Sequence, residues 1–118
     1  MASIRDRLIA SLNAAYDLPF FNEAQEAQLF TLIVDNVLHV IPGPVQTAME
    51  SAGAFVPQEV LDATTARVAL AIHDLLFTLI HRLPWLGNIV EPFAASKTIA
   101  TKIVSYASVG SHLPHLAD

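Results

Sequence analysis

The sequence predicts an all-α fold, a compact antiparallel bundle of four main helices and one short helix. Two observations lead to this prediction. Along most of its 118 residues the chain repeats apolar side chains at intervals of three and four, which is the period of an amphipathic helix. Prolines stand at positions 19, 42, 44, 57 and 84, and helices tend to stop before a proline. The corners at these points are short, and short corners favour antiparallel neighbours.

The first helix is expected over about residues 4–17. Ser3 precedes it and can act as an N-cap, because its hydroxyl accepts a hydrogen bond from a free backbone N–H group. The apolar residues recur at every fourth position and share one face: Ile4, Leu8, Leu12 and Tyr16. The apolar run at residues 8–13 is too short and too broken for a signal peptide, so we expect a cytoplasmic protein.

The second helix is expected from about Asn22 to Ile41. Asn22 and Gln25 approximate a capping box at its start. Glu23 and Glu26 place negative charge at the positive end of the helix dipole. The apolar residues surround most of the helix: Leu29, Phe30, Ile33, Val34, Val37, Leu38, Val40 and Ile41. More than one neighbouring element must therefore cover it.

A short helix is expected over residues 45–52, after the corner that Pro42, Gly43 and Pro44 form. One side of this segment is apolar and consists of Val45, Ala48, Met49 and Ala52. Gly53 is the expected stop, because glycine readily adopts the left-handed conformation that ends many helices.

The third main helix is the longest and is expected from Pro57, which suits a first helical turn, to Leu83. Its polar positions form one stripe that we expect to face water: Arg67, Asp74, Thr78, His81 and Arg82. His73 and Asp74 argue against a membrane-spanning helix, because a charged residue at the bilayer centre is costly to insert. We expect this helix and the second one to form the centre of the fold.

The last main helix is expected to start near Asn88, or near Glu91 if Pro92 takes the first helical position. It continues to about Val109. Gly110 then provides the stop, as glycine does at many helix ends.

The length of 118 residues fits a single domain. We expect residues 1–110 to form this helical domain. Residues 111–118 lack helical periodicity, so the sequence predicts a flexible C-terminal tail there.

The composition is apolar and poor in charge. Charged residues make up 14% of the sequence, against about 25% in average globular proteins, and hydrophobic residues make up 53%. The formal net charge is -5, with only 6 lysines and arginines, which argues against a nucleic-acid partner. The same shortage of cations argues against membrane association through a basic amphipathic helix and leaves reversible association through an exposed apolar helix as a third, weaker hypothesis. The sequence has no cysteine, which excludes disulfides and thiolate metal sites and fits a reducing compartment.

Histidine is the residue type best suited to catalysis or ligand binding here, but the histidines form no motif. His39 follows Asp35 by four residues, so the two share a helix face, as a carboxylate that orients an imidazole requires. His73 and His81 lie on neighbouring faces among aliphatic residues that can enclose a haem. A solvated polar stripe and a hydrogen-bonded histidine at the core edge are the simpler interpretations.

The sequence indicates no enzyme. It contains no serine in a nucleophile elbow and no glycine cluster that can cradle a phosphate. The acidic residues fall mainly near expected helix ends, where capping and the helix dipole account for them. His112 and His115 have metal-like spacing, but Pro114 and the expected flexibility of the tail argue against a site. We therefore expect no catalytic residue and no metal.

The surplus of apolar helix surface leads to a first functional hypothesis, an interaction or assembly protein. Such a protein buries the apolar faces of its second and third main helices in a homo-oligomer or against a helical protein partner. Interfaces of obligate oligomers are depleted in charged residues, which agrees with the low charge of this sequence. The residues expected at this interface are Phe30, Ile33, Val37, Leu76, Phe77 and Ile80.

The alternative hypothesis is a carrier for an apolar small molecule, such as a lipid, an isoprenoid or a haem, held between the helices. Such pockets are mostly apolar and contain a few polar anchors. The side chains available as anchors are Tyr16, His39, His73, His81 and Trp85. Trp85, Phe20 and Phe21 lie at expected corners of the chain. We expect these aromatic side chains to be buried at the ends of the core rather than exposed as anchors of an interface.

Overall fold

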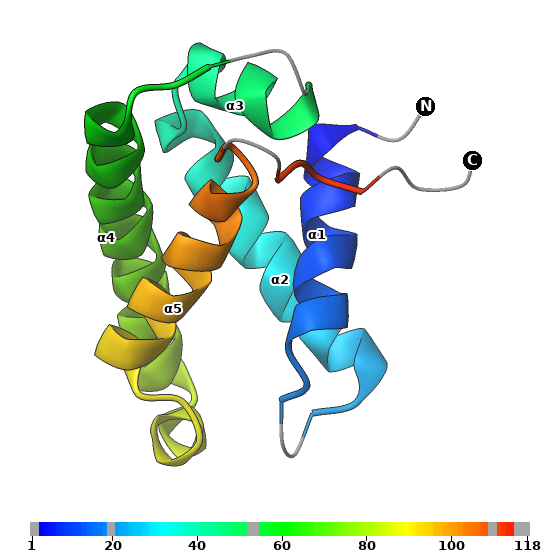
Figure 1. Cartoon of the computed structure of the whole chain (residues 1–118). Helices are drawn as coiled ribbons and strands as arrows, with labels where there is room; N and C mark the ends of the chain where they lie inside the picture. The colour runs from blue at the N-terminus through cyan, green and yellow to red at the C-terminus, as the bar shows by residue number, and fades with distance from the viewer. Residues whose placement is uncertain (1–2, 19–20, 52–54, 109–110, 115–118) are drawn as a thin grey trace.

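Figure 1 shows the computed structural model of the chain, which describes residues 3–18, 21–51, 55–108 and 111–114. Over these residues the protein is an all-α globule without strands, so the predicted fold class is confirmed. The elements are α1 (Ile4–Ala15), α2 (Glu23–Val37), the 3-10 helix η1 (Leu38–Val40), α3 (Gly43–Glu50), α4 (Gln58–Arg82), the 3-10 helix η2 (Pro84–Asn88) and α5 (Pro92–Ser105).

Side-chain caps fix where three of these helices begin. At α1, Ser3 accepts a hydrogen bond from a first-turn backbone N–H group at 3.2 Å. At α2, Asn22 and Gln25 form a reciprocal capping box with N···O distances of 2.8 and 3.0 Å. At α5, Glu91 accepts from two first-turn N–H groups at 2.6 and 3.2 Å, and the helix begins at Pro92. The two caps predicted from the sequence are confirmed.

Other helix ends differ from expectation by a few residues. α2 ends at Val37, and the chain tightens into η1 before Ile41. Ile41 itself is extended, with φ −89° and ψ 117°, because the proline that follows it disfavours the helical conformation. α3 begins at Gly43, two residues earlier than expected. The expected stops at Gly53 and Gly110 lie outside the described residues.

The long helices form two packed pairs that meet at α2 and α4. α1 packs against α2, α4 packs most extensively against α5, and α2 joins the pairs through its contacts with α4. Successive long helices run in opposite directions in Figure 1, where α1 descends, α2 rises, α4 descends and α5 rises. The short α3 lies across the upper end of the molecule in this view.

α2 supplies the centre of the core. Four of its side chains are 0% exposed, namely Phe30, Ile33, Val34 and Val37. Other elements surround them with fully buried residues, which include Leu8, Leu12, Val45, Met49, Val68, Ile72 and Ile103. Burying one such side chain stabilises the fold by about 1.5–3 kcal/mol. α2 is thus covered from several sides, as its apolar circumference predicts.

α4 was expected in the centre as well, but it lies at the edge of the fold. Its buried residues form a single stripe, Leu61, Thr64, Val68, Ile72 and Leu76. The other 20 of its 25 residues are exposed or half-buried. Among the described elements, α2, α5, η1 and η2 pack against α4 and cover this stripe and its flanks. α4 is also long and apolar enough to cross a membrane. This is weak evidence for a membrane-spanning helix, because core helices of soluble proteins share the same length and composition.

The first four residues of the expected tail pack against the domain. Leu113 is 2% exposed, and its N–H donates to the carbonyl oxygen of Met49 at 2.9 Å. Arg7, which is 6% exposed, donates to the carbonyl oxygens of Leu113 at 2.5 Å and Pro114 at 3.1 Å. Residues 111–114 therefore connect α1 and α3, and residues 115–118 lie outside the described part of the chain.

Candidate functional site

The side of α4 opposite its buried stripe is exposed and carries large apolar side chains among polar ones. Leu70 is 63% exposed and Phe77 is 53% exposed, whereas Leu76 on the buried stripe is 1% exposed. We call this side the outer face of α4 and define it by its exposed residues Glu59, Ala63, Ala66, Arg67, Leu70, Asp74, Phe77 and His81. A contiguous apolar patch rimmed by polar residues typically marks a binding surface.

Three residues of the outer face form a row along its middle. Ala63, Leu70 and Phe77 follow one another at intervals of seven, which is close to two helical turns. Seven is also the repeat of the positions that face the partner helix in a coiled coil. This row is therefore the part of α4 that another helix can approach most closely.

Aromatic rings line the outer face where it borders α5. The His73 ring lies 4.9 Å from the Phe93 ring and 6.1 Å from the Phe77 ring, measured between centroids. The His81 ring lies 4.6 Å from the Phe77 ring. Phe93 belongs to α5 and is 75% exposed. A groove of about 510 Å³ runs along this border, lined by Asp62, Thr65, Ala66, Ala69, Leu70, His73, Phe93, Ser96 and Lys97.

A second groove, of about 650 Å³, lies between the outer face and η1 and contains two opposite charges, Arg67 and Asp74. Both side chains are exposed. Within the described chain Arg67 forms no ion pair, and the Asp74 carboxylate lies 3.8 Å from Nδ1 of His73. Arg67 and Asp74 are about 10.5 Å apart along the helix axis, so they do not pair with each other.

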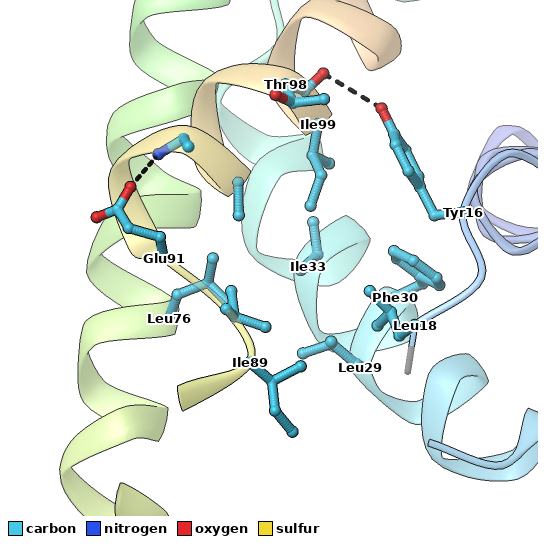
Figure 2. Close-up of a pocket in the computed structure, with 13 residues that line it drawn as sticks. Tyr16, Leu18, Leu29, Phe30, Ile33, Leu76, Ile89, Glu91, Thr98 and Ile99 are labelled. Atoms are coloured by element: carbon cyan, nitrogen blue, oxygen red, sulfur yellow. Dashed lines mark hydrogen bonds between the residues drawn. The ribbon is translucent and has the colours of Figure 1, made fainter. Parts of the chain in front are cut away.

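An apolar cavity of about 270 Å³ lies between the lower halves of α2, α4 and α5, with Tyr16 at its edge (Figure 2). Its walls are mainly aliphatic and consist of Leu18, Leu29, Phe30, Ile33, Leu76, Ile89, Val90, Ala94, Ala95 and Ile99 with Tyr16, Glu91 and Thr98. The Tyr16 hydroxyl donates to the carbonyl oxygen of Thr98 at 3.4 Å. Burial, together with the nearby Tyr106, raises the pKa of the Tyr16 phenol.

The cavity has few polar groups that a ligand can use. Both carboxylate oxygens of Glu91 accept hydrogen bonds from the backbone at the start of α5 (Figure 2 draws one of these bonds). The other polar side chains of the lining are Tyr16 and Thr98, and the Tyr16 hydroxyl already donates to the carbonyl oxygen of Thr98. The cavity is also slightly smaller than the range of about 300–1,000 Å³ typical of small-molecule sites. It suits a small apolar molecule better than a haem.

The five side chains expected to anchor a ligand do not converge on one cavity. Tyr16 lines the apolar cavity, whereas His39 and His73 lie in the two grooves beside the outer face. His81 is exposed, and its Nδ1 lies at a hydrogen-bonding distance of 3.0 Å from the carbonyl oxygen of Phe77. Trp85 is 46% exposed and packs its ring 5.9 Å from that of Phe21, so it covers the end of the fold without being buried.

The residues expected at an interface mostly face the interior. Phe30, Ile33 and Val37 are 0% exposed and Leu76 is 1% exposed, while Ile80 is half-buried. Of the six expected residues, Phe77 is the exposed one. The sequence reasoning did not single out Leu70 and Phe93, which are more exposed than Phe77. The seven-residue spacing of Leu70 and Phe77 within a stripe of polar residues was the available signal.

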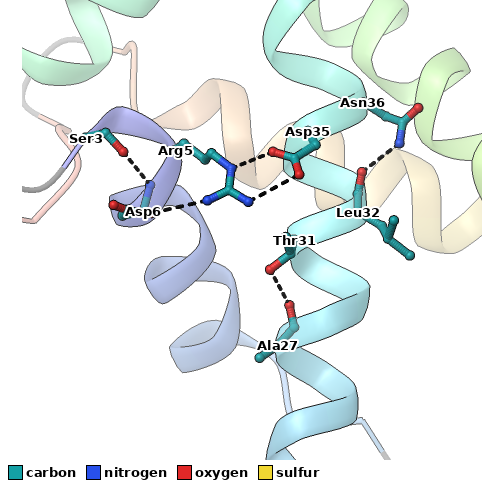
Figure 3. Close-up of polar contacts among 8 residues, drawn as sticks. All are labelled: Ser3, Arg5, Asp6, Ala27, Thr31, Leu32, Asp35 and Asn36. Atoms are coloured by element: carbon teal, nitrogen blue, oxygen red, sulfur yellow. Dashed lines mark hydrogen bonds and ion pairs between the residues drawn. The ribbon is translucent and has the colours of Figure 1, made fainter.

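Asp35 contacts an arginine rather than orienting His39. Figure 3 shows Arg5 of α1 donating from Nε and Nη2 to the two carboxylate oxygens of Asp35, at 2.6 and 3.2 Å. This hydrogen bonding lowers the pKa of Asp35 and raises that of Arg5. The pair joins the exposed surfaces of α1 and α2. His39 is exposed, and its expected pairing with Asp35 is not found.

Potential metal ligands are scattered over the part of the chain that the structure describes, which holds no group of three or more suitable side chains. His112 is half-buried, and its Nδ1 has no hydrogen-bond partner among the described residues. Its expected companion His115 lies outside the described residues.

No protein-family model, curated protein or solved structure matches this chain. The functional argument therefore depends on the geometry of the outer face and the apolar cavity.

Proposed function

We propose that the protein is a non-enzymatic assembly protein that self-associates through the outer face of α4. The observation that carries this proposal is the exposure of Leu70 and Phe77 in the middle of a 25-residue helix whose buried side is one narrow stripe. A helix with apolar residues around most of its circumference is stable when neighbours cover all of its sides. The α4 helix of a second copy supplies the neighbour that is missing within one chain.

The surroundings of the outer face also resemble those of a protein interface. Apolar and aromatic side chains occupy its centre and its α5 border, where Leu70, Phe77 and Phe93 are exposed. Charged residues stand mainly at the rim, as they do in protein–protein interfaces, whose centres are depleted in charge. Large aromatic side chains contribute much of the binding energy at such surfaces. Phe77 and Phe93 are the candidates for this role.

The test is the association state of the purified protein, measured by sedimentation velocity over a wide range of concentrations. We expect reversible dimers in the wild type and monomers in the variant Leu70→Glu, because the substitution introduces a charge at the centre of the interface. The control is Leu32→Glu, since Leu32 is 44% exposed on α2 and lies outside the outer face (Figure 3). A wild-type protein that stays monomeric at every concentration would overturn the proposal.

The apolar cavity supports a second candidate function, binding of a small apolar molecule such as a lipid fragment or an isoprenoid. Its aliphatic walls, with the Tyr16 hydroxyl at the edge, favour this function. Ala95→Phe places a larger side chain in the cavity wall and is expected to abolish binding of an apolar fluorescent probe. Native mass spectrometry that finds no bound molecule in freshly purified wild type, together with unchanged probe binding in the variant, would contradict this function.

A further inference from the structure

The outer face carries two opposite charges that have no strong partner within the described chain. Arg67 and Asp74 are exposed on the same border of the face, next to η1. The closest described group of opposite charge to Asp74 is a histidine nitrogen at 3.8 Å, which is charged only when protonated. A helix–helix interface commonly uses such flanking charges to select the partner and its direction.

The two charges are placed almost symmetrically about Leu70. Arg67 precedes Leu70 by three residues, and Asp74 follows it by four. When two copies of one helix pair in antiparallel directions about a two-fold axis, a residue before the centre stands beside a residue after the centre of the other copy. Residues on the same border of the face meet in this arrangement, whereas they point apart in a parallel pair.

We propose that two copies of the protein pair their α4 helices in antiparallel directions with Leu70 at the two-fold axis. Each Arg67 then lies beside Asp74 of the second copy, which gives two symmetry-related ion pairs. This inference rests on the proposed self-association and adds the direction of the helices, their register and the residues that determine specificity.

The same register matches the apolar residues by size. Ala63 precedes Leu70 by seven residues and Phe77 follows it by seven, so each small side chain faces a large one of the second copy. The two Leu70 side chains meet at the centre. Pairing of large with small residues fills an interface without voids or overlaps. Towards the ends, Glu59 and His81 are also equally distant from Leu70, by eleven residues each, and stand at the same level.

A parallel pair in the same register is less favourable on both counts. It places like residues at the same level, but Arg67 and Asp74 of the two copies then stand on opposite borders of the interface, so no ion pair forms between them. Phe77 then meets Phe77, while Ala63 meets Ala63 and leaves a gap between the helices. The antiparallel arrangement provides both the ion pairs and the match of large with small residues.

Charge reversal tests this register. We expect the single variants Arg67→Glu and Asp74→Lys each to weaken the dimer by about tenfold in Kd, because two weakly attractive contacts become repulsive. An equimolar mixture of the two single variants is expected to form a heterodimer about as stable as the wild-type dimer, since both contacts are attractive again. Sedimentation velocity measures all three associations.

The control is Asp17→Lys, which changes the net charge by the same amount as Asp74→Lys. Asp17 is exposed just after α1, on the far side of the molecule from α4 in Figure 1, and we expect this variant to leave the dimer unchanged. A wild-type dimer that is insensitive to both reversals would overturn the proposed register and leave the self-association proposal standing. Weakened single variants that do not recover on mixing would show that the charges do not meet across the interface.

Discussion

α2 and α4 both carry apolar residues around most of their circumference, but neighbouring elements cover the two helices to different extents. α2 is surrounded, and four of its side chains are completely inaccessible to solvent. α4 is covered on one side and exposes leucine and phenylalanine on the other. The apolar residues of a helix thus do not by themselves show which of its sides are covered, since neighbours within the described chain cover most of α2 but one side of α4.

The largest expected effect comes from substituting the same residue type in the two helices. Phe30→Ala in α2 should lower the free energy of unfolding by about 3–5 kcal/mol, because it leaves a cavity in the core. Phe77→Ala in α4 should change it by less than about 1 kcal/mol for the monomer, since the side chain is 53% exposed. Urea unfolding at low protein concentration measures both values. Equal losses would show that α4 is not an edge helix.

A second comparison stays within α4. Leu76→Ala on the buried stripe should lower the free energy of unfolding by about 2–5 kcal/mol. Leu70→Ala on the outer face should leave the unfolding of the monomer nearly unchanged and weaken association instead. Combined urea unfolding and sedimentation separate the two effects. Loss of monomer stability in Leu70→Ala as large as that in Leu76→Ala would contradict the division of α4 into two sides.

The sequence predicted those parts of the fold that depend on neighbouring residues. Two helix starts were predicted from local hydrogen bonds, one at Ser3 and one between Asn22 and Gln25, and the structure contains these bonds. The direction in which an apolar side chain points after packing depends on distant segments. Leu70 and Leu76 are the same residue type in the same helix, and only the positions of α2 and α5 make one exposed and the other buried.

The candidate site was harder to predict for the same reason. The spacing of four residues predicted a contact between Asp35 and His39. Instead, Arg5, which is thirty residues away in sequence, donates a hydrogen bond to the Asp35 carboxylate. Arg7 likewise binds backbone carbonyls more than a hundred residues away, which no periodicity in either segment indicates. Contacts of this range follow from the packing of whole helices, and a single sequence carries no direct record of them.

A smaller effect is expected at the capped start of α2. Asn22→Ala should lower the free energy of unfolding by about 1 kcal/mol, because a first-turn N–H group of α2 loses its acceptor. Asn22→Asp keeps an acceptor oxygen and should retain most of the stability. Thermal unfolding followed by circular dichroism compares the variants. If both substitutions destabilise equally, the capping bond is not what Asn22 contributes, and packing alone holds α2.

The smallest effect concerns the ion pair between α1 and α2. Hydrogen bonding from Arg5 lowers the pKa of Asp35 in the folded state below its ordinary value of 3.8. The carboxylate therefore stabilises the fold at pH values above 3.8, and this contribution is lost as the pH falls through the lower folded pKa. The difference in unfolding free energy between wild type and Asp35→Asn should be constant near neutral pH and shrink in acid.

Arg5→Met is the matched control for this pH dependence, because it removes the charge and the donors and leaves the carboxylate in place. The acid-sensitive difference between Asp35 and its amide should then disappear in the Arg5→Met background. Urea unfolding at a series of pH values measures it. The pair is exposed, and exposed pairs contribute little. A difference that does not vary with pH would mean that the ion pair adds nothing to the stability of α2. Coverage by apolar neighbours would then account for the whole difference in stability between α2 and α4.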